Sequence, residues 1–403
     1  MINVAILGFG TVGSGVAEVL DKNAAIIEQR VGQPIRVKYI VDIRDFPDSP
    51  YRDLFVKDFS VIEADPEVDV VVETIGGAKI ALEFTTRALK AGKSVVTSNK
   101  ELVATHGCEL LQLAREHGCN YLFEASVGGG IPVLRPLTNC LAANEIREIT
   151  GILNGTTNYI LTRMIRAGLT FDRALAEAQA NGYAEQDPTA DVDGHDACRK
   201  ICILSALACG KHVYPQQVPT QGIRNVTLED VAYAESKGLK IKLLGRCIHR
   251  EDGRVIAFTA PHLVPGENPL ACVEDVFNAI AVKGNAVGDV MFYGPGAGKL
   301  PTASAVVADV IDLAKDLKKD RRNGWGPGEE DLVVSSDVLA SGWYVRANCS
   351  VAQAKEACGE VQLLARSGAP ADEVAFLTAP MTEPELLEKL AGLDLSSHFR
   401  VLD

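Results

Sequence analysis

The chain has 403 residues, of which 47% are hydrophobic, and its formal net charge is −13 at pH 7. This length predicts two or three domains with buried cores, and the negative charge argues against nucleic acid or an anionic membrane surface as a partner. No apolar run has the length of a bilayer span and no basic, apolar targeting segment precedes the first strand, so we expect a cytoplasmic protein. The ten cysteines are scattered without a C-x-x-C pair, which favours reduced thiols over disulfides or a zinc site.

A short apolar strand, Ile2–Leu7, is followed by a glycine-rich turn and then by a helical pattern. The three glycines of this turn have the G-x-G-x-x-G spacing that lets a backbone approach a pyrophosphate at the start of a helix. The turn therefore predicts a dinucleotide site. Its candidate cofactor-binding residues are Gly8, Phe9, Gly10, Thr11, Val12 and Gly13.

Strands and helices alternate through the rest of the amino-terminal third, which predicts a doubly wound parallel sheet, a Rossmann-type domain over residues 1–135. In such a sheet the ligand lies at the carboxyl ends of the strands. Gly76 follows one predicted strand end and would let the backbone approach the dinucleotide closely. The expected strands are Ile35–Val41, Val68–Glu73, Ser94–Thr97 and Tyr121–Glu124, and the expected helices are Ile80–Ala91 and Ala104–His117.

The end of the second strand, V-D-I-R-D, bears on the choice of cofactor. Asp42 could accept a hydrogen bond from a ribose 2′-hydroxyl, as in NAD sites, whereas Arg44 could pair with the 2′-phosphate of NADP. We favour NADP, with some use of NAD. The alternative for Arg44 is a solvated loop charge.

Residues 136–294 are expected to form a second, α+β domain for catalysis and dimerisation. The run Gly151–Ile160 leads from a strand into a helix, and its N-G-T-T segment supplies amides and hydroxyls at the expected cleft. Strands at Gly245–His249 and Arg254–Leu263 predict a sheet that could pair across a homodimer.

The most informative segment lies between Ala178 and Lys200, where five carboxylates within twelve positions precede a lysine. Asp196 and Lys200 are four residues apart, so they share one helical face if Asp196 opens the following apolar helix. Such a face offers an amine for proton transfer and acids for a cationic substrate group. The alternative is a solvated acidic loop that caps a helix, with Lys200 on the surface.

This segment resembles the signature of the homoserine dehydrogenase family at Ala178, Gly182, Tyr183, Asp187, Pro188, Asp191, Val192, Gly194, Asp196 and Lys200. The resemblance implies an NAD(P)-dependent oxidoreductase that interconverts L-homoserine and L-aspartate 4-semialdehyde in threonine and methionine biosynthesis. It implies that Lys200, Lys100 and Asp196 are catalytic. It also implies that the substrate is bound by Glu185, Asp196, Gly182 and Asp191.

Two further segments resemble the same family. T-S-N-K ends a strand, which would place Asn99 and Lys100 beside the nicotinamide, although Lys100 could simply occupy the first turn of a helix. Gly298 matches a cofactor-contacting glycine where the chain returns to complete the nucleotide domain, at about residues 295–318.

A glycine-rich turn follows the last strand of the first domain. In the resembled family it binds a monovalent cation, here sodium or potassium, through the positions that match Glu124, Val127, Gly129 and Ile131. Hard oxygen ligands suit such an ion. A plain hinge between domains would have the same pattern.

Residues 319–336 shift to charged and then Gly/Pro-rich composition and are expected to be a linker. Beyond them, residues 337–403 have the strand–helix–strand–strand–helix–strand order of a ferredoxin-like domain, and this domain resembles the amino-acid-binding ACT domain. The expected elements are, in chain order, Trp343–Cys349, Val351–Cys358, Val361–Ser367, Glu373–Thr378, Glu383–Leu390 and His398–Leu402. The domain departs at Ser350–Ala354, where such domains have an Asp-x-Pro-Gly turn. We therefore expect a structural role in a homodimer or homotetramer, with weak or no inhibition by threonine. The alternative is a working effector site, because contacts from backbone amides need no particular side chain.

Two other classes of protein fit parts of the pattern. A semialdehyde dehydrogenase that uses a covalent thiol needs an activated cysteine at a strand end near the nicotinamide, and none of the ten cysteines has that place. A non-enzymatic dinucleotide sensor would not need the set of lysines and carboxylates that the signature implies.

Overall fold

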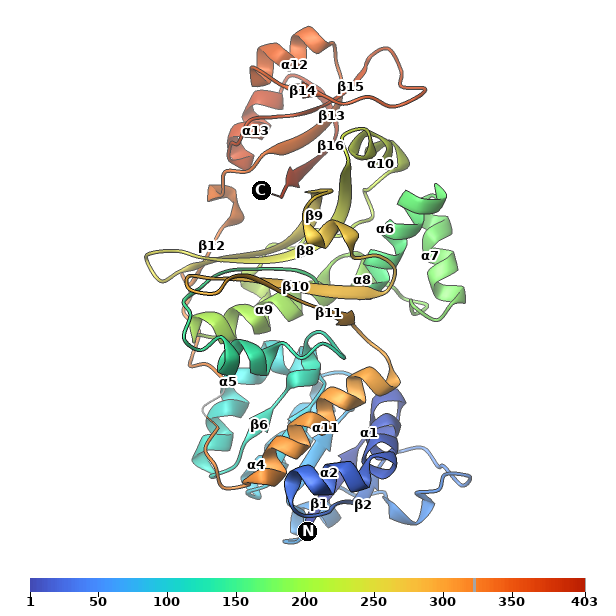
Figure 1. The fold of residues 1–403 in the computed structure, drawn as a ribbon, viewed down its shortest axis with the longest axis vertical. Coiled ribbons are helices and arrows are strands. Elements are labelled where there is room, and N and C mark those ends of the chain that lie inside the picture. The colour runs from blue at the N-terminus through green and yellow to red at the C-terminus, as the bar shows by residue number, and fades with distance from the viewer. Residues whose placement is uncertain (322–323, 403) are drawn as a thin grey trace. The chain divides into compact units, whose positions relative to one another are not determined.

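The computed structural model describes residues 1–321 and 324–402, which form two compact units (Figure 1). Residues 322–323 of the predicted linker and residue 403 of the predicted C-terminal domain lie outside the described residues. Among the described residues, no helix combines the length and the apolar character that a bilayer span requires. The first unit comprises Met1–Glu145, Cys202–Pro215 and Gly294–Glu330, and the second comprises Ile146–Ile201, Gln216–Tyr293 and Asp331–Asp403.

The first unit contains the predicted parallel sheet, in the order β3-β2-β1-β4-β5-β6. Three of the predicted strands have their expected bounds, and β6 ends two residues early because Glu124 begins a short 3₁₀ helix. The pairing is parallel throughout, so all the strands end at the same edge of the sheet. The strands are β1 (Ile2–Leu7), β2 (Ile35–Val41), β3 (Phe55–Val56), β4 (Val70–Glu73), β5 (Ser94–Thr97) and β6 (Tyr121–Leu122).

Helices cover both faces of this sheet (Figure 1). α1 (Thr11–Lys22), α2 (Ala24–Val31) and α11 (Lys299–Lys315) enclose one apolar core with alternate strand residues such as Val4 and Ile6. The alternate residues on the strands point to the other face, where α4 packs against α5 and contacts β4 and β5. The remaining helices of this unit are α3 (Ser60–Ala64), α4 (Lys79–Lys90) and α5 (Lys100–Glu116).

One helix begins four residues earlier than the sequence predicted. α5 starts at Lys100 rather than at Ala104, because the Asn99 side chain caps it by accepting a hydrogen bond from the Leu102 amide at 3.0 Å. Asparagine is among the preferred residues at this position, since its oxygen satisfies an amide that has no partner within the helix.

The second unit is built on a 10-stranded sheet with the order β11-β10-β7-β8-β9-β16-β13-β15-β14, and β12 pairs with β9. α6 packs against β8 and β10 of this sheet. The strands up to β12 are β7 (Ile146–Ile152), β8 (Leu239–His249), β9 (Val255–Pro265), β10 (Phe277–Gly284), β11 (Gly288–Pro295) and β12 (Val333–Val334). The helices are α6 (Gly155–Ala167), α7 (Phe171–Ala180), α8 (Thr189–Val192), α10 (Leu228–Glu235) and the first half of α9 (His195–Cys209), whose residues from Cys202 onward belong to the first unit.

The C-terminal part has the predicted element order, and its two helices have the predicted bounds. Its strands lie in the ferredoxin-like order β16-β13-β15-β14. β16 begins at Asp394, four residues before the predicted start, and its far end joins β9 in parallel through Arg400 opposite His262. The elements are β13 (Trp343–Asn348), α12 (Val351–Cys358), β14 (Gln362–Leu363), β15 (Glu373–Leu377), α13 (Glu383–Leu390) and β16 (Asp394–Val401).

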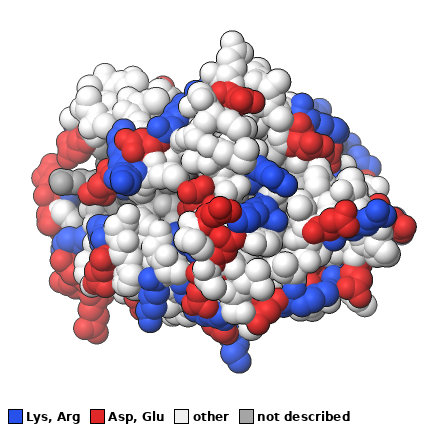
Figure 2. Space-filling model, turned by 90° about the horizontal axis from the view of Figure 1, so that it is seen from below, with Lys and Arg blue, Asp and Glu red and all other residues white. Residues whose placement is uncertain are grey.

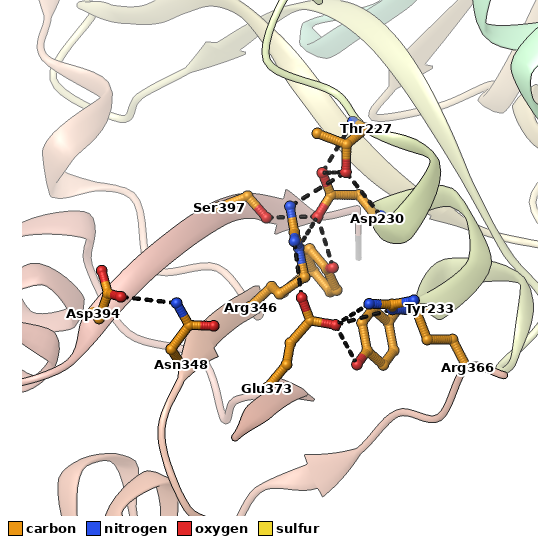
Figure 3. A network of polar contacts seen from close by, with 10 residues as sticks. Thr227, Asp230, Tyr233, Arg346, Asn348, Arg366, Glu373, Asp394 and Ser397 are labelled. Carbon is orange, nitrogen blue, oxygen red and sulfur yellow. Dashed lines mark hydrogen bonds and ion pairs between the residues drawn. The ribbon is translucent and has the colours of Figure 1, made fainter. Parts of the chain in front are cut away.

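A buried ionic network joins α10 to the ferredoxin-like strands (Figure 3). The fully buried Asp230 carboxylate on α10 accepts hydrogen bonds from side chains on β13 and β16. Arg346 connects it to Glu373 on β15, which also accepts from the Tyr233 hydroxyl at 2.9 Å. Each carboxylate therefore has several charged or polar donors, as a buried charge requires. The donors to Asp230 from β13 and β16 are Tyr344, Arg346 and Ser397, at 2.9, 2.8 and 2.6 Å.

Described residues of the predicted linker pack against both units. Trp325 is buried in the first unit, where its indole N–H donates to His212 Nδ1 at 2.6 Å. His212 Nε2 lies 3.0 Å from the carbonyl oxygen of Ala104, so this imidazole joins the linker to α5. Further along, Val333 and Val334 pair with β9 in the second unit.

On the face shown in Figure 2, Lys and Arg side chains are interspersed with Asp and Glu side chains. A continuous basic surface is the usual footprint of nucleic-acid binding, and this face does not have one.

Candidate active site

The signature segment places a buried ion pair at the start of α9. Lys200 Nζ donates to Asp196 Oδ2 at 2.7 Å and to the carbonyl oxygen of Leu153 at 2.7 Å. Asp196 and Lys200 are 3% and 8% exposed. Their predicted position on one helical face is confirmed, and this burial excludes the alternative of a surface lysine.

A second carboxylate, Asp191, is tied to this pair by Asn154. The Asn154 side-chain amide donates to Asp191 Oδ1 at 2.6 Å and to Asp196 Oδ2 at 2.9 Å. Burial and then repulsion from Asp196 raise the pKa of Asp191, while hydrogen bonding to Asn154 and attraction to Lys200 oppose this rise. The group therefore holds two carboxylates around one ammonium and one neutral amide.

The other predicted substrate residues lie on the loop between α7 and α8. Glu185 is exposed, and its carboxylate makes no hydrogen bond or ion pair to the described residues. Gly182 follows Asn181, the C-cap of α7, and the loop is tied to α6 where Thr156 Oγ1 donates to the Tyr183 carbonyl oxygen at 2.7 Å. The structure thus brings Asp191, Asp196 and Lys200 together and leaves Glu185 at the surface of the same unit.

The glycine turn between β1 and α1 is very closely packed. A Cβ atom on Gly13 would lie 1.9 Å from the carbonyl oxygen of Gly8, so any side chain at position 13 would displace the turn. This close approach of helix to strand is the role that dinucleotide-binding turns give to their third glycine. Gly298 also precedes a helix of this unit, as the N-cap of α11.

Asp42 and Arg44 form an ion pair beside the glycine turn. The buried Asp42 carboxylate accepts from the Phe9 amide at 2.7 Å, and from Arg44 Nε at 3.0 Å and Nη2 at 2.9 Å. The Arg44 hydrogen bonds hold the pKa of Asp42 well below its usual range. The Arg44 side chain remains 59% exposed, and its guanidinium lies 5.2 Å from the centre of the Phe46 ring.

Asn99 organises the loop after β4. Its amide donates to the carbonyl oxygens of Ile75 at 3.2 Å and Gly77 at 2.8 Å, which fixes the backbone on both sides of Gly76. Its carbonyl oxygen caps α5, so the Asn99 side chain acts on the protein backbone in this structure. Lys100 is the first residue of α5 and belongs to the first unit, whereas Lys200 belongs to the second.

Sequence reasoning missed a buried acid at this strand end. Glu73, the last residue of β4, accepts from Thr97 Oγ1 at 2.5 Å and from the Ile75 amide at 2.6 Å. Burial raises the pKa of Glu73 to about 7. The available signal was a carboxylate that ends an apolar strand, one strand away from T-S-N-K.

In the predicted cation turn, Glu124–Ile131, the side-chain carboxylate and the backbone carbonyl oxygens differ in whether they already accept hydrogen bonds. The Glu124 carboxylate is used by the backbone, since it accepts from the amides of Val133, Leu134 and Arg135 at 2.7 to 2.9 Å. By contrast, the carbonyl oxygens of Val127, Gly129 and Ile131 accept no hydrogen bond from the described residues. Carbonyl oxygens suit an alkali cation, so the donor set fits the predicted ion, with Glu124 contributing no more than its backbone carbonyl.

Two family models match most of the chain. The model described as "Homoserine dehydrogenase, NAD binding domain" matches residues 8–124, and the one described as "Homoserine dehydrogenase" matches residues 132–311. A homoserine dehydrogenase of Bacillus subtilis is 42% identical over 322 residues, which cover 79% of this chain and 74% of that protein. One of Pseudomonas aeruginosa is 44% identical over 324 residues, which cover 80% and 74%.

Solved structures of homoserine dehydrogenases are also similar to this chain. A homoserine dehydrogenase from Thiobacillus denitrificans has a TM-score of 0.90 and 34% identity, and the match covers 100% of this chain and 98% of that chain. A hyperthermophilic archaeal homoserine dehydrogenase in complex with NADPH has a TM-score of 0.65 and 29% identity, with 77% and 97% covered.

Proposed function

Because the chain belongs to the homoserine dehydrogenase family, we propose that it interconverts L-homoserine and L-aspartate 4-semialdehyde with NADP as the preferred cofactor. The observation that carries this proposal is the buried Asp196–Lys200 pair within the family signature. The reaction would serve threonine and methionine biosynthesis.

The acids of the site suit the substrate's ammonium group. Asp191 and Asp196 place two carboxylates around one lysine, which leaves a negative balance for a cation. Glu185, on its exposed loop, would add a third carboxylate when the substrate is bound.

Lys200 suits the substrate's terminal oxygen. An ammonium group has three donors, and two of those on Lys200 bind Leu153 and Asp196, so the third has no partner among the described residues. Lys200 would give a proton to the aldehyde oxygen during reduction and take it back from the homoserine hydroxyl during oxidation. When bound, the nicotinamide accepts or supplies the hydride.

The arrangement beside the glycine turn supports NADP over NAD. Asp42 is buried with its oxygens already engaged by Phe9 and Arg44, so it is poorly placed to accept from a ribose hydroxyl. Arg44 presents an exposed guanidinium to bind a 2′-phosphate. Lys100, the first residue of α5, would instead lie beside the nicotinamide, where its positive charge would assist the proton transfer.

We also propose a homodimer formed through the sheet of the second unit, with a homotetramer as the alternative. β11 is an edge strand of this sheet, and it exposes large apolar side chains. Met291 and Tyr293 are 42% and 55% exposed, and Tyr293 stacks on the partly exposed Phe277 of β10. Exposed apolar patches of this kind mark protein interfaces.

A direct assay tests the proposed reaction. The purified enzyme should oxidise NADPH when L-aspartate 4-semialdehyde is added and reduce NADP when L-homoserine is added. Lys200→Ala should lower turnover by about two to four powers of ten, as expected for a lost acid–base group, with NADPH binding retained. Lys237→Ala, an exposed lysine of the same unit, is the matched control. Near-normal turnover in folded Lys200→Ala would contradict the assignment.

A further inference from the structure

We infer that Asn154 is a positioning residue that holds Asp191 and Asp196 together as the receptor for the substrate's ammonium group. This inference rests on the proposed function and extends it to a residue outside the family signature. Asn154 lies 37 and 42 positions before the two carboxylates, at the junction of β7 and α6.

Every hydrogen-bonding group on the Asn154 side chain is engaged. The two amide contacts reach Asp191 at 2.6 Å and Asp196 at 2.9 Å. The carbonyl oxygen accepts from the Thr157 amide at 2.8 Å and from Thr157 Oγ1 at 2.9 Å, which caps α6. The cap fixes the orientation of the side chain, so the amide can only point at the carboxylates.

The charges explain why an amide is suited to this position. Asp191 and Asp196 repel each other, and of these two acids Lys200 donates a hydrogen bond only to Asp196, at 2.7 Å. The Asn154 amide supplies a donor to each acid without adding a charge, so the pair keeps the negative balance that an ammonium group needs. A lysine or arginine at position 154 would cancel that balance.

Two substitutions separate positioning from capping. Serine and aspartate are both good N-cap residues, so Asn154→Ser and Asn154→Asp should retain α6. Neither can donate to both acids: serine has one hydroxyl proton, and an ionised aspartate has none and adds a third negative charge. If Asn154 were only a cap, both variants would behave like the wild type.

The first measurement is a pH profile of kcat/KM for L-homoserine. Asn154→Ser should lower kcat/KM by at least about tenfold, the usual cost of losing a hydrogen bond to a charged group, mainly through the KM for homoserine. Its acidic limb should move to higher pH, because Asp191 loses a donor and keeps the repulsion of Asp196, against the attraction of Lys200. Asn154→Asp should show the larger shift. The KM for NADP should stay unchanged in both variants.

The second measurement follows the Asp191 carboxyl carbon by NMR titration, which needs no turnover. The pH at the midpoint of this titration should be higher in both variants than in the wild type. Ser350→Ala, which removes the cap of α12, is the control: it should lower the melting temperature and leave kcat/KM unchanged.

The outcomes are distinguishable. A wild-type enzyme that does not oxidise homoserine contradicts the proposed function, and the NMR titration still decides the role of Asn154. Wild-type pH profiles and midpoints in both variants would overturn the inference, as would lost activity without any pH shift, which would indicate local distortion. If Asn154→Asp does not fold, Asn154→Ser decides.

Discussion

The Asp42 carboxylate lies between the backbone amide of Phe9 and the guanidinium of Arg44 and accepts hydrogen bonds from both. Asp42 thus connects the glycine turn between β1 and α1 to Arg44, the side chain expected to select the cofactor. Phe9, the middle residue between the first two motif glycines, also packs edge-on against Phe46, over which Arg44 lies.

Arg44→Ala should raise the KM for NADP by about tenfold or more, since a charge-assisted contact to phosphate is lost, and should change the KM for NAD much less. Steady-state kinetics with both cofactors measure the difference. Arg30→Ala, an exposed arginine on α2, is the control. Equal effects of Arg44→Ala on both cofactors would mean that Arg44 only holds Asp42 in place.

The contribution of Glu73 to the free energy of unfolding should fall as pH rises from about 4.5 to 7. The pKa of Glu73 is raised from its ordinary 4.5 to about 7 by burial, so the folded state binds more protons than the unfolded state in this window. The full effect for one group is about 3 kcal/mol at most. Asp309, whose pKa burial also raises to about 7, acts in the same direction, whereas the buried His212 and His262, whose pKa burial lowers, act in the opposite direction.

Denaturant unfolding across that window, compared between the wild type and Glu73→Gln, checks this. The free energy of unfolding of the variant should rise relative to that of the wild type as pH increases across the window, because glutamine does not titrate, while the exposed Glu28→Gln should keep the wild-type slope. Identical slopes in wild type and Glu73→Gln would show that the carboxylate is ionised throughout.

Replacing sodium or potassium with tetramethylammonium at fixed ionic strength should lower the melting temperature and the activity, because the bulky ion cannot reach the carbonyl oxygens of the Glu124–Ile131 turn. Gly129→Ala should remove this dependence, since its Cβ would lie 2.3 Å from the Gly296 carbonyl oxygen. Gly118→Ala controls for left-handed backbone strain alone, because it has a similar positive φ and open space around it. Unchanged stability and activity on cation exchange would contradict the cation site.

Threonine should inhibit weakly or not at all. The turn where ACT domains have Pro-Gly is closed by a capping box, in which Ser350 Oγ accepts from the Gln353 amide at 3.2 Å and Gln353 Oε1 accepts from the Ser350 amide at 2.9 Å. Those two amides are therefore not available to a ligand. Initial rates with L-threonine, with D-threonine as the control, test this. Strong stereospecific inhibition that does not compete with homoserine would show a working sensor.

The sequence could predict the features that depend on local spacing. The glycine turn and the Asp196–Lys200 pair are short-range patterns, and both follow from one turn or one helical repeat. The first residues of the two helices in the ferredoxin-like part could be predicted because Ser350 and Thr382 form capping boxes there.

Contacts across the fold could not be predicted. Asn154 meets Asp196 across 42 positions, and Glu73 meets Thr97 across two neighbouring strands. The start of β16 was missed because its two serines are typical of a loop, and only the bond from Ser397 to buried Asp230 makes a polar residue acceptable there. The direction in which Asp42 points likewise depends on Phe9, 33 positions away.

The junction between β9 and β16 bears on how this enzyme can be shortened. Removal of the chain after residue 336 would expose the β9 edge to other molecules, and edges of this kind promote aggregation. It would also leave Asp230 buried without Tyr344, Arg346 and Ser397. Any loss of activity in a truncated enzyme would therefore reflect damage to the sheet rather than the loss of a regulatory domain. Only point substitutions can separate these two effects.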